Sequence, residues 1–504
     1  MHAIGIDVGS TNVKVALVDD HGRCLADASR PLRTRTDGAS VGQDADELWA
    51  TLVDALREVT TARPDAAADV ATLGVCSQYS SLVPVDADGA ALAPIKMYLD
   101  TRGADACWAI LERHPDAFDT WVARHGIPPI GGGLTLSHLL HFQQDEADLH
   151  ARTAAYLEVM DLVNLRLTGT VAATQCTMFA AQLCDNRTVG TTSYDDELVA
   201  MAGVDVDRLP PLIPIDGVVG EVRDDVAAQL GLPHGVAVRA GMNDTQAGAF
   251  ATGALADDGR CGLMVGTTAV LIRSMPAFGV DLEREVLSMP VPVPGRYVVM
   301  AENGIAGRAV ERALEVLSPE ATTTEARFAE LESALSTSPP GAGGLLFLPW
   351  LAGSMSPSSS SQMRGGYLGM TLQTQRADLL RATVEGVARN LRWLHPAVDA
   401  LCGTEATEVL FAGGAARSEG VARTLSDVLG LPVLVPERPE LAAAIAVGTV
   451  AAARANGADP VTSGSTPSRR HEPDPSCAEV HARLQPIFED AFSANGPICQ
   501  ALGS

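Results

Sequence analysis

The same local pattern occurs twice in this chain, at positions half a chain length apart. Residues 5–15 and residues 262–272 each hold an apolar run, a turn of glycine followed by two hydroxyl residues, and a second apolar run. Short apolar runs bounded by turn residues are typical of buried β-strands. One copy per half predicts a duplicated α/β fold with a cleft between its lobes, and a chance recurrence of a common turn is the alternative.

The first copy continues in a definite order. A third strand is expected near residues 23–28, a helix over residues 46–59 and a buried strand over residues 70–76. A chain of 504 residues is also long enough for two domains. We therefore divide it into an N-terminal lobe, residues 1–248, and a C-terminal lobe, residues 249–504.

Charge and composition exclude several classes of protein. The formal net charge of −26 argues against nucleic acid and anionic membrane as main partners. The start lacks a basic segment, and the apolar run near residues 441–453 is too short to span a bilayer. Nine single cysteines without a CxxC pair fit neither a zinc site nor a disulfide framework. We expect a cytoplasmic protein, with a homodimer as a candidate assembly.

The first turn has the chemistry of a phosphate site. The small residues Gly9, Ser10 and Thr11 let backbone amides and hydroxyls approach an anion closely. Asp7 lies just before the turn, where its carboxylate can hold a hydrated Mg²⁺ ion, and Lys14 can add a point charge. The alternative is an ordinary hairpin capped by an aspartate.

The second turn offers the same groups. Gly266, Thr267 and Thr268 supply backbone amides and two hydroxyls, but Met264 stands where the first copy has its aspartate. Two such turns facing each other would hold a polyphosphate from opposite sides. The shared ligand would then be a nucleoside triphosphate at the lobe boundary.

A carboxylate follows another apolar run in the middle of the chain. Residues 236–238 lead through Gly241 to Asn243 and Asp244, and a helix of small residues comes next. Asp244 can accept a proton from a substrate hydroxyl. An aspartate at this place can equally be the N-cap of the helix, and the sequence alone does not decide between the two.

Two other segments carry candidate binding residues. Gly413, Gly414 and Ala415 form a strand-to-helix turn that offers a flat surface to adenine or ribose, although helix–sheet packing uses the same glycines. Loop residues of one lobe can hydrogen-bond a polyol. These are Gln78, Tyr79, Asp100 and Arg102, of which the last two can also form an ordinary surface ion pair.

Together these residues resemble the FGGY carbohydrate kinases, whose superfamily also contains hexokinase, actin and the heat-shock ATPases. The resemblance covers nearly the whole chain and is most specific over residues 365–385. There the family's C-terminal signature is matched by Gly365, Tyr367, Gly369, Met370, Asp378, Leu379, Ala382 and Glu385.

The resemblance implies a fold and an activity. The fold is α/β, with two actin-like (ribonuclease H-like) lobes of mixed five-stranded sheets flanked by helices. Asp244 resembles the base that deprotonates the sugar, Asp7 lies near Mg²⁺, and the two hydroxyl turns hold the phosphates of ATP. Residues 413–415 face the adenosine, and Gln78, Tyr79, Asp100, Arg102 and Asn243 face the sugar.

Two departures from the family lie on the sugar-binding lobe. His138 and His141 occupy positions where the N-terminal signature has lysine and tryptophan, and we expect them to be helix-surface or packing residues. Xylulose kinases usually have Met-His after the glutamine at position 78, where this chain has Tyr79 and Ser80. These departures bear on the identity of the sugar and leave phosphoryl transfer in place.

The resulting hypothesis is ATP-dependent phosphorylation of a pentulose such as D-xylulose. Another acceptor is an alternative, because Arg102 or a nearby histidine can meet the carboxylate of gluconate. Ribulose, a hexulose or a polyol are further acceptors to consider. A regulator that binds ATP and sugar without turnover is the alternative from another class, and the base at Asp244 argues against it.

Overall fold

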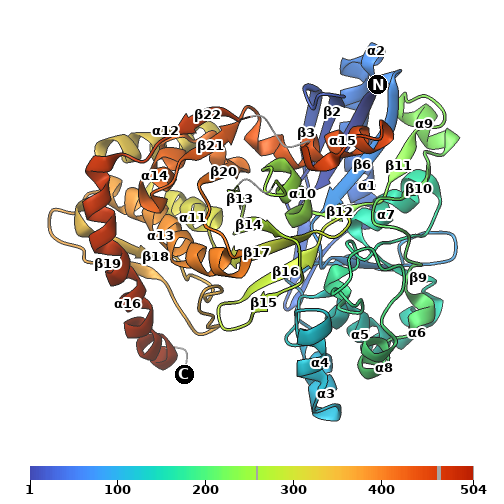
Figure 1. The fold of residues 1–504 in the computed structure, drawn as a ribbon, viewed down its shortest axis with the longest axis horizontal. Coiled ribbons are helices and arrows are strands. Elements are labelled where there is room, and N and C mark those ends of the chain that lie inside the picture. Colours follow the sequence, from blue (N-terminus) through green and yellow to red (C-terminus); the bar gives the residue numbers. More distant parts are fainter. Residues whose placement is uncertain (257–258, 463–466, 503–504) are drawn as a thin grey trace.

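Two large β-sheets organise the chain, one built from its first half and one from its second (Figure 1). The computed structural model describes residues 1–256, 259–462 and 467–502. The first sheet has seven strands and the second has eight. Within the described residues, no helix combines the length and the apolar character needed to cross a membrane.

The first sheet contains the N-terminal repeat. Its strands, in spatial order, are β10 (Val218–Glu221), β11 (Ala237–Arg239), β6 (Val70–Ser77), β1 (His2–Val8), β2 (Asn12–Asp19) and β3 (Cys24–Pro31), with β12 (Met242–Asn243) also paired to β6.

The second sheet contains the other repeat. Its strands, in spatial order, are β15 (Val280–Asp281), β16 (Val286–Pro290), β17 (Tyr297–Asn303), β14 (Ala269–Met275), β13 (Arg260–Val265), β20 (Glu408–Ala412), β21 (Val433–Pro436) and β22 (Pro467–His471).

The two sheets share one pairing scheme. In the first, β1 is antiparallel to β2 and parallel to β6, and β2 is antiparallel to β3. In the second, β13 is antiparallel to β14 and parallel to β20, and β14 is antiparallel to β17. The parallel pairs β6–β11 and β20–β21 complete a mixed five-stranded core in each half. The α/β prediction with a repeated core is confirmed, and edge strands enlarge both sheets beyond five.

Helices flank the sheets in both halves of the chain. They are α1 (Ala45–Ala62), α2 (Pro64–Ala67), α3 (Ala104–Arg113), α4 (Ala117–Arg124), α5 (Thr135–Asp145), α6 (Ala147–Arg152), α7 (Val159–Thr168), α8 (Asp196–Ala202), α9 (Asp224–Leu230), α10 (Asp244–Ala251), α11 (Gly307–Leu317), α12 (Thr324–Thr337), α13 (Arg376–Cys402), α14 (Glu419–Leu429), α15 (Ala442–Ala455) and α16 (Ala478–Leu502).

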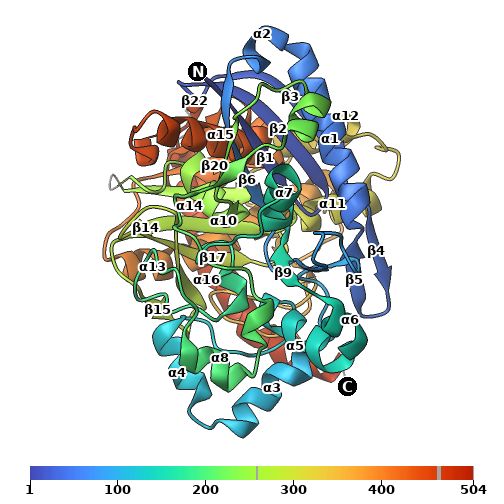
Figure 2. The ribbon, with the colours of Figure 1, turned by 90° about the vertical axis from the view of Figure 1, so that its right-hand side faces the viewer.

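A further subdomain in the first half of the chain was not predicted. Its five-stranded sheet joins β4 (Thr34–Asp37) and β5 (Ser40–Gln43), which precede β6, to β8 (Ile95–Lys96), β7 (Leu82–Val85) and β9 (Ala155–Glu158), which are inserted between β6 and β10. Helices α3, α4, α5, α6 and α8 gather beyond one end of the first sheet in Figure 2. A small sheet of β18 (Leu346–Leu348) and β19 (Gly366–Leu368) lies in the other half.

Two helices form the layer between the large sheets. Helix α15, from the second half of the chain, packs on β1, β6 and β2 of the first sheet. Helix α10 packs on α15 and also on β13 and β14 of the second sheet. Gly5 and Gly448 lie at the α15–β1 contact, where a Cβ on Gly5 would stand 1.8 Å from the carbonyl oxygen of Ala444. The helix therefore approaches the strand backbone to backbone.

We predict that Gly5→Ala destabilises the protein by about 3 kcal/mol or more, because neither backbone can yield to the added methyl group. Gly366→Ala is the control, since a Cβ there meets no atom within 4 Å, and it should change the free energy of unfolding by less than about 1 kcal/mol. Urea unfolding of both variants measures the difference. Equal midpoints would show that the α15–β1 contact is loose.

Candidate active site

The carboxyl ends of three neighbouring strands bring two carboxylates together. Asp7 on β1 pairs with Cys76 on β6, and Cys76 pairs with Met242 on β12. These parallel strands end at one edge of the sheet. Asp244 follows two residues after Met242, so it leaves the sheet at the same edge as Asp7.

The cap of α10 is Asn243 and not Asp244. Asn243 Oδ1 accepts a hydrogen bond of 2.8 Å from the backbone N–H of Gln246, and Gln246 Oε1 accepts one of 2.9 Å from the backbone N–H of Asn243. This capping box satisfies the helix start. Asp244 is the first residue of α10, so its carboxylate is left for another role. Asn243, which was predicted to face the sugar, uses its side-chain oxygen for the cap.

The environment of Asp244 favours its protonated form. Burial, followed by the nearby charges of Asp7 and Glu302, raises the pKa of Asp244 to about 7. The backbone amides of Thr245 and of Asp244 itself oppose this rise. A carboxylate with a pKa near neutrality can take up and release a proton under ordinary conditions.

Asp7 is buried and paired with a lysine. Lys14 Nζ lies 3.3 Å from Asp7 Oδ2, and Asp7 is the main cause of a raised Lys14 pKa. No group of three or more metal-ligating side chains occurs among the residues with described positions. Mg²⁺ commonly takes one or two protein carboxylates and keeps its waters. A single buried carboxylate beside a hydroxyl turn therefore fits that ion.

The two hydroxyl turns are built on corresponding strand pairs. The Gly9 N–H donates to Asn12 O at 3.0 Å, and the Gly266 N–H donates to Thr268 O at 2.9 Å. Thr267 O also accepts from the backbone of Ala306, at the start of α11. Each turn thus presents its hydroxyls at the end of a central strand.

The predicted adenosine turn lies against the second hydroxyl turn. Gly413 adopts a φ of 99°, and a Cβ there would stand 2.3 Å from Val265 O, one residue before Gly266. Gly414 and Ala415 follow in a short helix, and a Cβ on Gly414 would meet nothing within 4 Å. A nucleotide can therefore extend from one turn to the other.

Glu302 belongs to the site but was not predicted from the sequence. It lies on β17 in register with Val270 of β14, just beyond Thr268. After burial, Glu302 is the largest cause of the raised pKa of Tyr79 and Tyr98, and Asp244 is the next. Its signal was a lone carboxylate at the end of the apolar run of β17, the same placement that singled out Asp7.

A chain of amides joins the predicted sugar loop to the first turn. Gln78 Nε2 donates to Gln43 Oε1 at 2.9 Å, and Gln43 Nε2 donates to Ser10 O at 2.8 Å. Tyr79 packs where two hydrophobic clusters of the core meet. Gln43 was not predicted, because no local pattern shows that it meets Gln78, which lies 35 residues further along the chain.

Asp100 and Arg102 form an ion pair with a buried carboxylate. Arg102 Nε lies 2.9 Å from Asp100 Oδ1, and Arg102 Nη2 lies 2.6 Å from Oδ2. Asp100 is 1% exposed, whereas the Arg102 side chain is 33% exposed. The pairing predicted as an alternative is thus present, and its two-point geometry is that of a firm guanidinium–carboxylate contact.

His138 and His141 are both buried, so of the two expected alternatives, helix-surface or packing residues, the structure confirms packing positions. Both lie on α5, and burial lowers the pKa of His138 to about 4. His141 Nδ1 lies 2.8 Å from Lys96 Nζ, and Lys96 Nζ also lies 2.8 Å from Glu146 Oε1. The surrounding subdomain covers α5, which the local sequence did not show.

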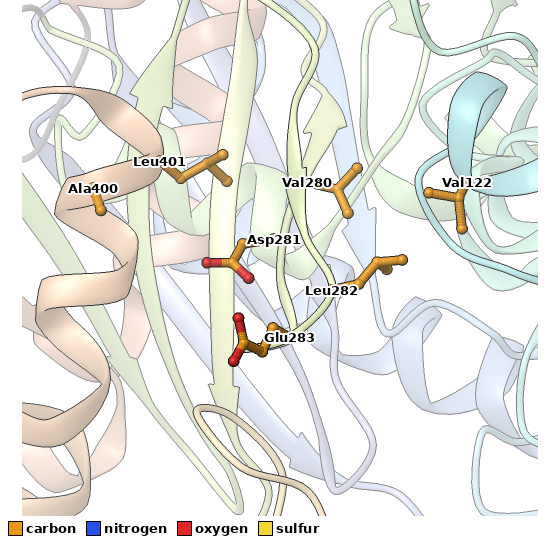
Figure 3. A pocket seen from close by; sticks show the side chains of 7 residues that line it. All are labelled: Val122, Val280, Asp281, Leu282, Glu283, Ala400 and Leu401. Carbon is orange, nitrogen blue, oxygen red and sulfur yellow. The ribbon is translucent and has the colours of Figure 1, made fainter. Parts of the chain in front are cut away.

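A hollow of about 590 Å³ lies away from these residues. Figure 3 shows Val122 of α4 facing Val280 and Leu282, and the carboxylates of Asp281 and Glu283 on the side of α13. Its lining contains none of the predicted site residues. The hollow is therefore separate from the candidate active site.

Comparison with known proteins gives consistent matches. The family models for the N-terminal and C-terminal domains of the FGGY family of carbohydrate kinases match residues 2–251 and 206–455. The xylulose kinase of Bacillus subtilis (strain 168) is 26% identical over 87% of this chain and 85% of its own length. The gluconokinase of the same strain is 24% identical over 97% of this chain and 94% of its own length. The crystal structure of xylulose kinase from Rhodospirillum rubrum has a TM-score of 0.84 and 26% identity, covering 99% of this chain and 100% of that one.

We predict that Asp244→Asn stabilises the protein at pH 8 by about 1–3 kcal/mol and has less effect at pH 5. The folded protein holds a proton on Asp244 up to about pH 7, whereas the unfolded chain releases it near the ordinary aspartate pKa of 3.8. The wild type therefore loses stability as the pH rises between these values, and the amide variant does not.

Urea unfolding at the two pH values measures this difference. Glu112→Gln, a change on the exposed side of α3, is the control and should show no such pH dependence. A gain of the same size at both pH values would contradict the prediction.

Proposed function

Because this chain belongs to the FGGY family of carbohydrate kinases, we propose that it transfers the terminal phosphoryl group of ATP to a hydroxyl of a pentulose such as D-xylulose. The single observation that carries this proposal is Asp244. Asp244 follows β12 at the carboxyl edge of the first sheet, where Asp7 also lies. It does not cap α10, because Asn243 does, and its pKa is raised to about 7.

In the proposed reaction, residues of both lobes hold the nucleotide and Asp244 takes one proton from the sugar. Asp244 accepts the proton of the sugar hydroxyl as its oxygen bonds to phosphorus and the bond to the leaving ADP breaks. Backbone amides and hydroxyls of the two turns steady the phosphates, and residues 413–415 support the adenosine. Asp7 would hold Mg²⁺, which offsets the charge of the phosphates when bound. Closure of the two lobes would exclude water and limit hydrolysis of ATP.

The charges of the sugar lobe favour a neutral acceptor over an aldonate. Arg102 is held by Asp100 and Lys96 by Glu146, and His138 is neutral at pH 7 because of its lowered pKa. A carboxylate on the substrate would have to share each of these cations with an acidic partner, which weakens the attraction. This observation favours a ketose over gluconate, although relatives named for both sugars exist.

Several expectations remain proposals alongside the activity. They are the division at residue 248, a cytoplasmic location, a homodimer, and the absence of nucleic-acid and membrane partners, for which the net charge of −26 is the argument.

We predict that Asp244→Ala lowers turnover by about 10²- to 10⁴-fold while the protein stays folded, because the hydroxyl loses its proton acceptor. ADP release measures this against a panel of pentuloses, hexuloses, polyols and gluconate. The wild type should release ADP only with sugar, and most with a pentulose.

Other results would contradict the proposal. Unchanged turnover in Asp244→Ala would remove the assigned base. A preference for gluconate would overturn the argument from paired cations. A rise in melting temperature with sugar but without any phosphorylated product would favour the regulator.

We predict that kcat/KM falls below about pH 7, tenfold per pH unit, because Asp244 acts only in its deprotonated form. Since the charge of Glu302 helps to raise that pKa, Glu302→Gln should move the acid limb of the profile to lower pH. Glu112→Gln on α3 removes a distant charge and should leave the limb in place. A profile unmoved by Glu302→Gln would show that the two carboxylates do not interact.

A further inference from the structure

Three buried polar atoms beside the sugar loop have no hydrogen-bond partner in the protein. They are Gln78 Oε1, Ser80 Oγ and His138 Nδ1. None of the three residues is more than 3% exposed. A buried polar atom left without a partner is costly, so each of these positions calls for a ligand or a water molecule.

The hydrogen bonds fix the tautomer of His138. Its Nε2 lies 3.3 Å from the carbonyl oxygen of Ser80. A carbonyl can only accept, so Nε2 carries the proton, and in a neutral ring Nδ1 then holds a lone pair. Burial lowers the pKa of His138 to about 4, which keeps the ring neutral. The open atom of His138 is therefore an acceptor.

The loop around Ser80 is held in an unusual conformation. Ser80 has a φ of 55°, a left-handed value that is uncommon outside glycine and marks strain. The Glu158 carboxylate accepts from Ser81 N at 3.0 Å and from the Thr135 hydroxyl. Glu158 and His138 thus hold the loop in place.

The open atoms define the chemistry of what can bind. Gln78 Oε1 and His138 Nδ1 both accept, and Ser80 Oγ can accept or donate. Asp100 is the charged group with the largest influence on His138, ahead of Lys96 and His141. A ligand that presents hydroxyl donors matches this set, and a carboxylate does not.

We propose that His138 is a specificity-determining residue, whose Nδ1 accepts a hydrogen bond from one hydroxyl of the acceptor sugar beside Gln78 Oε1 and Ser80 Oγ. The proposal rests on the proposed kinase function for the identity of its ligand. His138, which stands where the family signature has lysine, would then help to recognise a neutral polyhydroxy compound.

His138→Phe tests the assignment, because a phenylalanine ring fills a similar space and offers no acceptor at the Nδ1 position. We expect its sugar KM to rise about tenfold, with the ATP KM and kcat changed less than about twofold. Singly deoxygenated sugars give the sharper readout. One of them should lose about tenfold in kcat/KM with wild type and lose nothing further with His138→Phe.

His125→Phe is the matched control. His125 is also fully buried, and its Nε2 bonds to a carbonyl, that of Phe179 at 2.9 Å. It should leave the sugar KM and the deoxy-sugar pattern unchanged. Ser80→Gly relieves the left-handed strain and removes one of the three atoms, so it tests the same site if His138→Phe fails to fold, again through a raised sugar KM.

The outcomes separate this proposal from the kinase function. An unchanged sugar KM in His138→Phe and Ser80→Gly, or equal deoxy-sugar losses in both enzymes, would show that water fills the site and would overturn the proposal. If wild type phosphorylates no sugar, the function fails first. Calorimetric titration of D-xylulose into wild type and His138→Phe then tests the site, and binding that is equal or absent in both also overturns it.

Discussion

The close contact between helix α15 and strand β1 sets the arrangement of the whole molecule. Backbone meets backbone at Gly5 and Gly448, so α15 lies flat on the first sheet although it comes from the second half of the chain. Helix α10 packs on α15 and reaches the second sheet. One shared layer therefore joins the two halves, and the residue that begins α10 is Asp244. The position of the candidate base Asp244 is therefore set by the packing of two helices, not by a polar interaction of its side chain.

The same layer explains the electrostatics of the site. Asp7, Asp244 and Glu302 come from β1, α10 and β17, and the layer brings their carboxylates close enough to influence one another. Mutual repulsion and burial destabilise the ionised form of Asp244. That cost lowers the stability of the fold at high pH, yet it is also what gives the carboxylate a pKa suited to accepting a proton. The burial and repulsion of the Asp244 carboxylate thus lower the stability of the fold and at the same time support the proposed activity.

The sequence predicted those parts of the fold that local patterns encode. The repeated strand–turn–strand units, β3, α1 and β6 are confirmed, because each has its own periodicity and turn residues. The sheet of the further subdomain and the edge strands were missed, since short strands carry weak local signals. In the candidate site, Asp7 and Asp244 stood out at strand ends, and their roles stay predictions. Glu302, the capping role of Asn243 and the buried state of His138 depend on contacts between distant segments.

The two cations named at the turns, within the described residues, are both paired, although an acidic protein has to attract a polyphosphate there. Lys14 is engaged by Asp7, and Arg308, beside the second turn, is engaged by Glu311 and Glu315. The phosphates would then be attracted by oriented backbone amides, by hydroxyl groups and by the cation that accompanies ATP. On the sugar lobe the cations are paired in the same way, at Asp100 and Glu146. Both ligands of the proposed reaction would therefore be recognised by dipoles and hydrogen bonds, whose directions discriminate between neutral sugars in a way that a point charge cannot.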